Sequence, residues 1–261
     1  MSLTRPMQTC VFLSGLVLFV AIDGIAEPEL YGQVLMLAPA VALLGLPHGA
    51  LDLPMADVMW PLDTWQRKLL FFAGYLGLAG GVAGLWLLAP GLGLALFLAY
   101  SALHFSGDWA ADGSAMRIAG GALAIGAPAI FHTAEVAEIF ALLGPATAAR
   151  PIAEAAALLG LSCALIAVAA GLRGLWRPRA LLELTGIWIG AALLPPLLYF
   201  IAYFCLLHSL RHLIETLDAV PDRLRAIRVG GLAMALTLVG STAALTALMV
   251  LGGGNLEASI L

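Results

Sequence analysis

The stretch PPLLYFIAYFCLLHSLRHL, residues 195–213, combines a long apolar run with a polar end. No charged side chain occurs from Pro195 to Leu207, whereas His208, Arg211 and His212 follow directly. An uncharged run of this kind is typical of a helix in the bilayer core, where ionisable side chains are costly and usually mark function. The stretch therefore predicts a membrane helix with a polar site near one end.

The composition of the whole chain agrees with this interpretation. Of its 261 residues, 62% are hydrophobic and 11% are charged, whereas soluble domains have about 45–50% apolar and about 25% charged residues. The apolar runs are long and lack the alternation of a membrane barrel, so they indicate helices. We expect an all-α integral membrane protein, a polytopic bundle that forms one transmembrane domain over residues 1–261.

Nine transmembrane spans are predicted, with eight as the alternative. They are 8–24, 31–51, 68–89, 92–109, 116–133, 151–172, 180–195, 197–214 and 229–251. Residues 134–148 are expected to form a short outer helix or an interfacial segment. The pair Pro195-Pro196 should break the chain between the seventh and eighth spans.

The basic residues fix the orientation of these spans. With the N-terminus in the cytoplasm, eleven of the twelve Lys and Arg residues fall on the inner side and only Arg150 falls outside. Lys and Arg prefer cytoplasmic loops. We therefore predict a multi-pass protein of the inner (plasma) membrane with a cytoplasmic N-terminus.

Several functional classes are not supported by the sequence. The three cysteines, Cys10, Cys163 and Cys205, form no CxxC pair, so neither a disulfide framework nor a thiolate metal site is expected. No basic cluster suits nucleic acid. The chain has no HExxH metalloprotease motif, no GxSxG nucleophile motif and no pair of matching interrupted helices typical of transporters.

Four of the five histidines are predicted to lie at one depth. His48, His104 and the pair His208 and His212 fall near the inner ends of three spans that all run from outside to inside. His132 falls near the outer end of another span. The pattern favours a shared metal site, with a proton relay or a structural coincidence as alternatives.

The spacing around these histidines supports the metal hypothesis. His208 and His212 are four residues apart and share a helix face, while Asp52 and Asp108 each follow a histidine by four residues. Imidazole suits Fe, Zn, Cu or Ni. Asp52 and Asp108 are then candidate acceptors for the second ring N–H of the ligands, although direct coordination by a carboxylate is an alternative. Arg211 is expected to extend to the inner membrane surface.

The motifs GLPHGALDLP at 45–54, SALHFSGDW at 101–109 and HSLRHLIE at 208–215 resemble those of Brp/Blh-type β-carotene 15,15′-dioxygenases. These bacterial and archaeal membrane enzymes are associated with retinal supply for rhodopsins. The resemblance implies Fe(II) and O₂ as cofactor and co-substrate, all-trans-retinal as product, and His48, His104, His208 and His212 as iron ligands. Ser106, which separates the HF pair from Gly107, departs from the family pattern and bears on the role of Asp108.

The implied substrate is a rigid polyene that dissolves in lipid, so an apolar tunnel is expected beside the metal. The aromatic residues predicted to line it are Tyr100, Phe105, Trp188, Tyr199, Tyr203 and Phe204. Expected partners are β-carotene, membrane lipid and, by function, a retinal-binding rhodopsin, but no nucleic acid; the sequence does not fix an oligomeric state. An oxygenase for another isoprenoid or lipid, and a histidine-based proton-coupled transporter, are the alternative functions.

Overall fold

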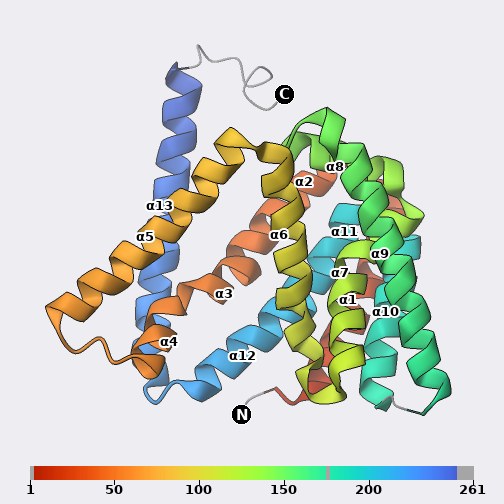
Figure 1. Ribbon diagram of the computed structural model, residues 1–261, viewed down its shortest axis with the longest axis horizontal. Coiled ribbons are helices and arrows are strands. Elements are labelled where there is room, and N and C mark those ends of the chain that lie inside the picture. The colour runs from red at the N-terminus through yellow and green to blue at the C-terminus, as the bar shows by residue number, and fades with distance from the viewer. Residues whose placement is uncertain (1–2, 175–176, 252–261) are drawn as a thin grey trace.

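A computed structural model describes residues 3–174 and 177–251, without the side chains of residues 48, 244, 245 and 247–251. All secondary structure in these ranges is helical, which confirms the predicted all-α class (Figure 1). The elements are α1 (Arg5–Ala26), α2 (Leu30–Ala40), η1 (Val41–Gly45), α3 (Leu46–Ala50), α4 (Asp52–Met59), α5 (Trp65–Leu88), α6 (Pro90–Phe105), η2 (Ser106–Asp112), α7 (Ser114–Phe131), α8 (Thr133–Leu143), α9 (Ala146–Leu172), α10 (Pro178–Leu193), α11 (Pro196–Phe200), η3 (Ile201–Ser209), α12 (Leu210–Ala219) and α13 (Arg223–Leu251).

Each predicted span coincides with a helical rod, but the count of nine spans stays a prediction. Within the described ranges, six helices are long and apolar enough to cross a membrane: α1, α5, α7, α9, the continuous rod Pro196–Ala219, and Arg223–Ala243 of α13. Two other rods, α6 and α10, have 16 residues each. The predicted span 31–51 is formed by α2, η1 and α3 in succession.

Prolines and one side-chain cap set several helix boundaries. Pro90, Pro178 and Pro196 each lie in the first turn of a helix, where the missing N–H removes no helical hydrogen bond. At the start of α5, the Thr64 hydroxyl accepts a hydrogen bond from the Arg67 backbone N–H at 3.3 Å. The predicted break at Pro195-Pro196 is confirmed, because α10 ends at Leu193 and α11 begins at Pro196.

Two of the rods contain π-helical segments next to histidines. In η1 the Leu46 N–H donates to the carbonyl of Val41, five residues earlier, and Pro47 follows without an N–H of its own. His48 lies in α3, which follows η1, and His208 lies near the end of η3. Such local widening of a helix is frequent at functional sites because it redirects side chains.

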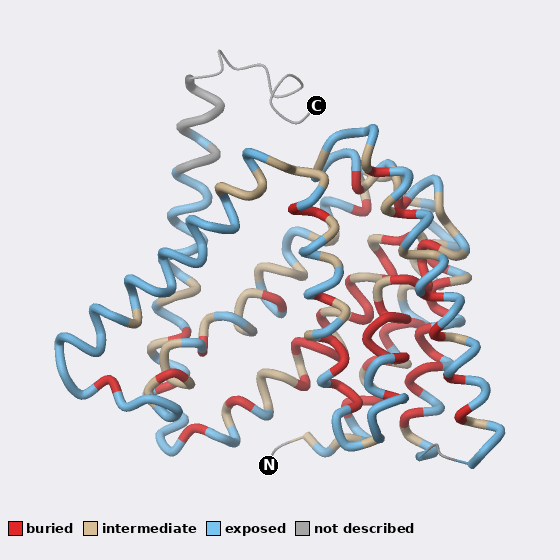
Figure 2. Tube along the Cα trace, in the orientation of Figure 1, coloured by how far each residue is buried: buried red, intermediate tan, exposed pale blue. Residues whose placement is uncertain are grey.

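The bundle has a packed half and an open half, which Figure 2 distinguishes by burial. The packed half consists of α1, α6, α7, α9, α10, α11 and η3, and it contains the main hydrophobic core. There α7 and α9 cross at Gly126 and Gly160, where a Cβ on Gly126 would lie 2.6 Å from the Gly160 Cα. The open half consists of α2, η1, α3, α4, α5 and α13; its helix α5 buries no residue.

Candidate metal centre

Three of the four predicted ligands come together where α6 meets the rod of η3 and α12. The ring centroids of His104 and His208 are 4.9 Å apart, those of His104 and His212 are 6.0 Å apart, and those of His208 and His212 are 6.3 Å apart. The structure thus joins segments more than a hundred residues apart in one histidine cluster, which we define as His104, His208 and His212.

The fourth predicted ligand, His48, lies in α3, but its side chain is outside the described residues. The backbone around it is close to the cluster, because α3 packs against α12 and η1 packs against η3. Gly45 allows η1 to pack closely against η3, because a Cβ at this position would lie 2.9 Å from Cε1 of Phe204. The HGALD motif therefore passes beside the helix that carries His208 and His212.

The donor chemistry of the cluster fits a first-row transition metal. Imidazole nitrogens bind such ions at about 2.0–2.1 Å, so rings that share one ion have centroids roughly 4.5–6.5 Å apart. The three distances lie in this range. Among the described side chains, no group of three or more histidines, cysteines, aspartates or glutamates is arranged so that it could hold a metal ion. A metal shared by these histidines and the HGALD motif therefore stays a prediction.

Asp108 holds one ring of the cluster. Nδ1 of His208 lies 3.1 Å from Oδ2 of Asp108, and the Tyr203 hydroxyl donates to the same oxygen at 3.0 Å. Because an ionised carboxylate only accepts, Nδ1 carries the proton and the lone pair of His208 lies on Nε2. This is the arrangement by which a carboxylate orients a ligating histidine. The partner of Asp108 is His208, from a distant segment, although His104 belongs to the same motif as Asp108.

The structure does not bring Asp52 to the described histidines. It lies at the start of α4, where its side chain is hydrogen-bonded to Tyr75 of α5. Partial burial raises the pKa of the Asp52 carboxyl above its ordinary value, and the hydrogen bond with Tyr75 acts in the opposite direction. A role for Asp52 at the metal stays a prediction.

The expectation that Arg211 extends to the membrane surface is wrong. Its side chain is 1% exposed and donates to Glu183, to the backbone carbonyl of Asp108 and to Gln8. The guanidinium points inward because buried acceptors satisfy it there. Glu183 and Gln8 were missed from the sequence, although an acid within the apolar span 180–195 is itself a sign of a buried site.

The predicted aromatic residues fall into three groups. Phe105 and Phe204 flank His208 with ring centroids at 4.6 and 5.9 Å, and Tyr100 stacks on His104 at 6.1 Å. Tyr199 and Tyr203 are buried and use their hydroxyls on Ala124 and Asp108. Trp188 packs instead on Phe131, with ring centroids 5.1 Å apart.

His132 is at the junction of α7 and α8, where Nδ1 lies 3.3 Å from a carboxylate oxygen of Glu135. The structure places it outside the cluster.

Long apolar helices and histidines gathered from distant segments define the class: a helical membrane protein with a candidate metal centre. The sequence model of the family Beta-carotene 15,15'-dioxygenase matches residues 39–259, and the chain belongs to this family. The resemblance stated from the motifs is thereby confirmed. All four predicted histidine ligands lie in the matched residues, whereas α1 precedes them.

A relative called Beta-carotene 15,15'-dioxygenase, from an uncultured marine bacterium (66A03), is 33% identical to the chain over 187 residues. The similar region covers 66% of this chain and 65% of that relative, so the chain spans about two thirds of the relative's length. No solved structure matches the fold.

Proposed function

We propose that this chain is an iron-dependent membrane enzyme that cleaves the central 15,15′ double bond of β-carotene with O₂ to give two all-trans-retinal. The observation that carries the proposal is the convergence of His104, His208 and His212, with the closest ring centroids 4.9 Å apart, inside the residues that match the family.

In this proposal His48, His104, His208 and His212 hold the iron. When bound, Fe(II) supplies the activation of O₂, a chemistry that neutral imidazole ligands suit because they leave the charge of the ion intact. Asp108 keeps the proton of His208 on Nδ1, and Tyr203 donates a second hydrogen bond to the same carboxylate oxygen. The protein needs no nucleophile of its own and acts by binding and positioning.

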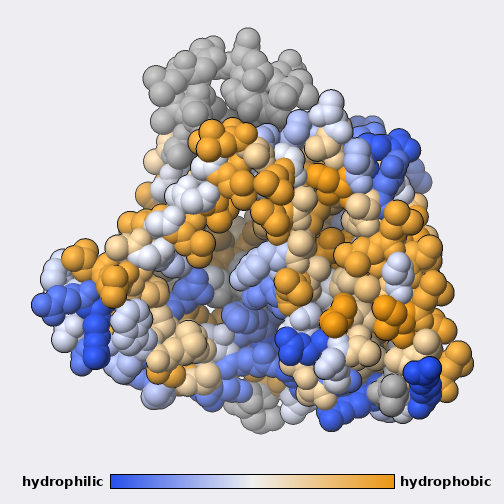
Figure 3. Space-filling view, viewed as in Figure 1, coloured by the Kyte–Doolittle hydropathy of each residue, from blue (hydrophilic) through white to orange (hydrophobic). Residues whose placement is uncertain are grey.

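In this proposal the substrate binds on the side of the cluster that faces the open half. Figure 3 shows this face hollowed between α5 and α6, with hydrophobic residues along both helices. Exposed apolar side chains of these two helices include Leu76 of α5 and Phe97 and Tyr100 of α6. A lipid-dissolved polyene can pass along such side chains without contact with water, and Phe105 and Phe204 then exclude water beside His208.

The apolar helices support a membrane protein, and we further propose that it is a multi-pass protein of the inner (plasma) membrane with the histidine cluster in its cytoplasmic half. Membrane lipid would be the source of the carotenoid. Retinal is the chromophore that a rhodopsin binds, so a rhodopsin is the proposed functional partner of the product.

Expression in a bacterial host that accumulates β-carotene tests the proposal. The cells should lose their colour and form retinal, whereas cells with a His104→Ala variant at equal membrane level should stay coloured. With ¹⁸O₂, label should appear in both retinal molecules. Unchanged colour and no retinal, with the chain confirmed in the membrane, would refute the proposal.

The same experiment separates the alternatives. Cleavage of another carotenoid or lipid, with β-carotene left intact, would indicate a different substrate for the same oxygenase chemistry. Negligible iron in purified, folded protein would favour a proton-coupled transporter that uses the histidines.

A further inference from the structure

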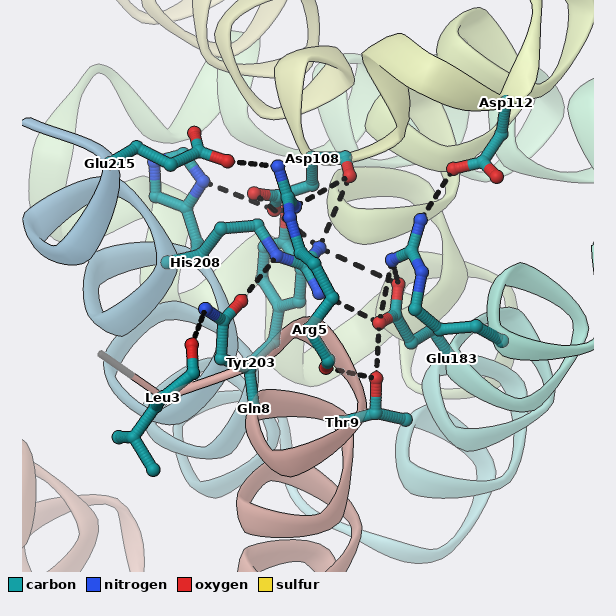
Figure 4. A network of polar contacts seen from close by, with 12 residues as sticks. Leu3, Arg5, Gln8, Thr9, Asp108, Asp112, Glu183, Tyr203, His208 and Glu215 are labelled. Atoms are coloured by element: carbon teal, nitrogen blue, oxygen red, sulfur yellow. Dashed lines mark hydrogen bonds and ion pairs between the residues drawn. The ribbon is translucent and has the colours of Figure 1, made fainter. Parts of the chain in front are cut away.

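A buried polar network lies next to His208 and joins four separate segments of the chain (Figure 4). We propose that Arg211 and Glu183 form a positioning pair that, with Gln8 of α1, holds Asp108 against His208 and so fixes which nitrogen of His208 faces the cluster. The inference rests on the proposed function in taking His208 as an iron ligand.

All three nitrogens of the Arg211 guanidinium have buried partners. Nη2 donates to Oε1 of Glu183 at 2.7 Å, Nη1 to the backbone carbonyl of Asp108 at 3.2 Å, and Nε to Oε1 of Gln8 at 3.2 Å. Arg211 is 1% exposed and Glu183 is 0% exposed. A planar guanidinium with three directed bonds can hold one orientation, which the point charge of a lysine cannot do.

Glu183 is in turn held by groups on both sides. Nη1 of Arg179 donates to its two carboxylate oxygens at 2.9 and 3.0 Å, and the Thr9 hydroxyl donates to Oε1 at 2.6 Å. Arg179 also pairs with Asp112 at 2.7 Å. The carboxylate that receives Arg211 is therefore itself fixed to α1, to its own helix α10 and, through Arg179, to η2.

Asp108 connects the network to the cluster. Its backbone carbonyl accepts from Arg211, while its side chain accepts from His208 and Tyr203. Tyr203, His208 and Arg211 all belong to the rod Pro196–Ala219, so Asp108 is bound at three points by the rod that it orients. This closed arrangement fixes the carboxylate relative to Nδ1 of His208 and leaves Nε2 for the cluster.

The N-terminal helix belongs to this network although it precedes the residues that match the family. Gln8 binds Arg211, Thr9 binds Glu183, and Nη1 of Arg5 donates to the Asp108 carbonyl at 3.4 Å. Gln8 is also tied to the Leu3 carbonyl at 3.0 Å. In this chain the site is therefore supported by α1 as well as by the helices that carry the histidines.

The test compares Arg211→Lys with Arg67→Lys, a matched control in the exposed pair Arg67–Asp63. Each variant is purified in detergent and loaded with Fe(II), and the rate of iron loss to a chelator is measured beside kcat and KM. For Arg211→Lys we expect iron loss to be about 10–100-fold faster and kcat to fall, with little change in KM, as for other groups that orient metal ligands. Arg67→Lys should match the wild type.

Two further measurements separate positioning from general loss of structure. In metal-free protein labelled with ¹⁵N-histidine, the His208 ring should be one tautomer in the wild type and a mixture in Arg211→Lys. Gln8→Ala removes one acceptor of Arg211 and the hydrogen bond to the Leu3 carbonyl but no charged side chain, so it should fold and lose iron about 2–10-fold faster than the wild type.

Folded Arg211→Lys and Gln8→Ala variants with the iron retention, kcat and His208 tautomer of the wild type would overturn the positioning pair. If Arg211→Lys does not fold, Gln8→Ala decides in the same way. A wild-type chain that binds iron but does not cleave β-carotene would refute the proposed function alone, and faster iron loss from the variants would then still support the positioning pair.

Discussion

The packed half and the open half of the bundle differ in the side chains that their helices present to one another. In the packed half, α7 buries most of its length and meets α9 through small residues such as Gly126 and Gly160. In the open half, α5 also contains several glycines, but none of its residues is buried and a Cβ at Gly77 would meet no atom within 4 Å. Glycine thus permits close helix packing between α7 and α9, whereas Gly77 has no packing role in α5.

The two halves contribute different parts of the candidate site. His104 and His208 belong to the packed half, and Asp108 and Arg211 anchor His208 through buried bonds. His48 lies on α3 of the open half. Within a membrane, close packing of small residues and hydrogen bonds hold helices together, because lipid competes for apolar contacts. We infer that the packed half keeps two predicted ligands, His104 and His208, in place while the open half admits a long substrate.

The largest expected effect comes from removal of a ligand in either half. His104→Ala and His48→Ala should each lower retinal formation by more than about 100-fold, since even groups that only orient a metal ligand contribute about 10–100-fold. His132→Ala is the control, because this residue lies at the α7–α8 junction beside Glu135. Retinal is quantified by chromatography at equal protein level. If His48→Ala retained activity, the open half would carry no ligand.

The next effect concerns ion pairs. Glu183→Ala leaves Arg211 and Arg179 without their shared carboxylate in a buried site, which should lower the free energy of unfolding by about 3–5 kcal/mol. Glu154→Ala breaks the exposed pair with Arg150 and should cost less than about 1 kcal/mol. Denaturant titration of both variants in the same detergent measures the difference. Equal midpoints would show that the buried network does not stabilise the packed half.

Glycine-to-alanine substitutions in the two halves should change stability by smaller amounts and in different directions. Gly126→Ala would place a Cβ 2.6 Å from the carbonyl of Ala156 and from Gly160, so it should destabilise the protein by about 1–3 kcal/mol. Gly77→Ala meets open space in α5 and should be neutral or stabilising by up to about 1 kcal/mol, because alanine is the better helix former. Thermal unfolding of both variants shows whether each substitution lowers or raises the stability. A loss of stability from Gly77→Ala would mean that α5 is packed after all.

The sequence predicted the parts of this structure that depend on local pattern. Apolar runs and prolines located the helical rods, the break before Pro196 and a short helix near residues 134–148, found as Thr133–Leu143. The common depth of the histidines followed from the alternating direction of the spans, and the structure does bring His104, His208 and His212 together. These features need no knowledge of which helices are neighbours.

The direction of Arg211 could not be predicted in this way. Its partners Gln8, Asp108 and Glu183 lie on three other segments. When one helix is considered alone, the membrane surface is the only polar environment within reach of a cation near the helix end. For the same reason the sequence predicted Asp108 as an acceptor for a ring N–H of the candidate ligands but did not identify His208, on a distant segment, as the donor. Long-range partners of polar groups depend on helix packing, which the pattern of one span does not contain.

The smallest effect concerns the aromatic residues predicted to contact the substrate. Tyr100 is 67% exposed and stacks on His104 with ring centroids 6.1 Å apart, whereas Trp188 packs on Phe131. Tyr100→Ala removes some tens of Å² of apolar contact, worth about 1 kcal/mol at roughly 25 cal/mol per Å², so KM for β-carotene should rise several-fold. Trp188→Ala should leave KM unchanged. If both variants raise KM equally, the polyene must extend along α10 in the packed half, and the division between a half that holds ligands and a half that admits substrate would fail.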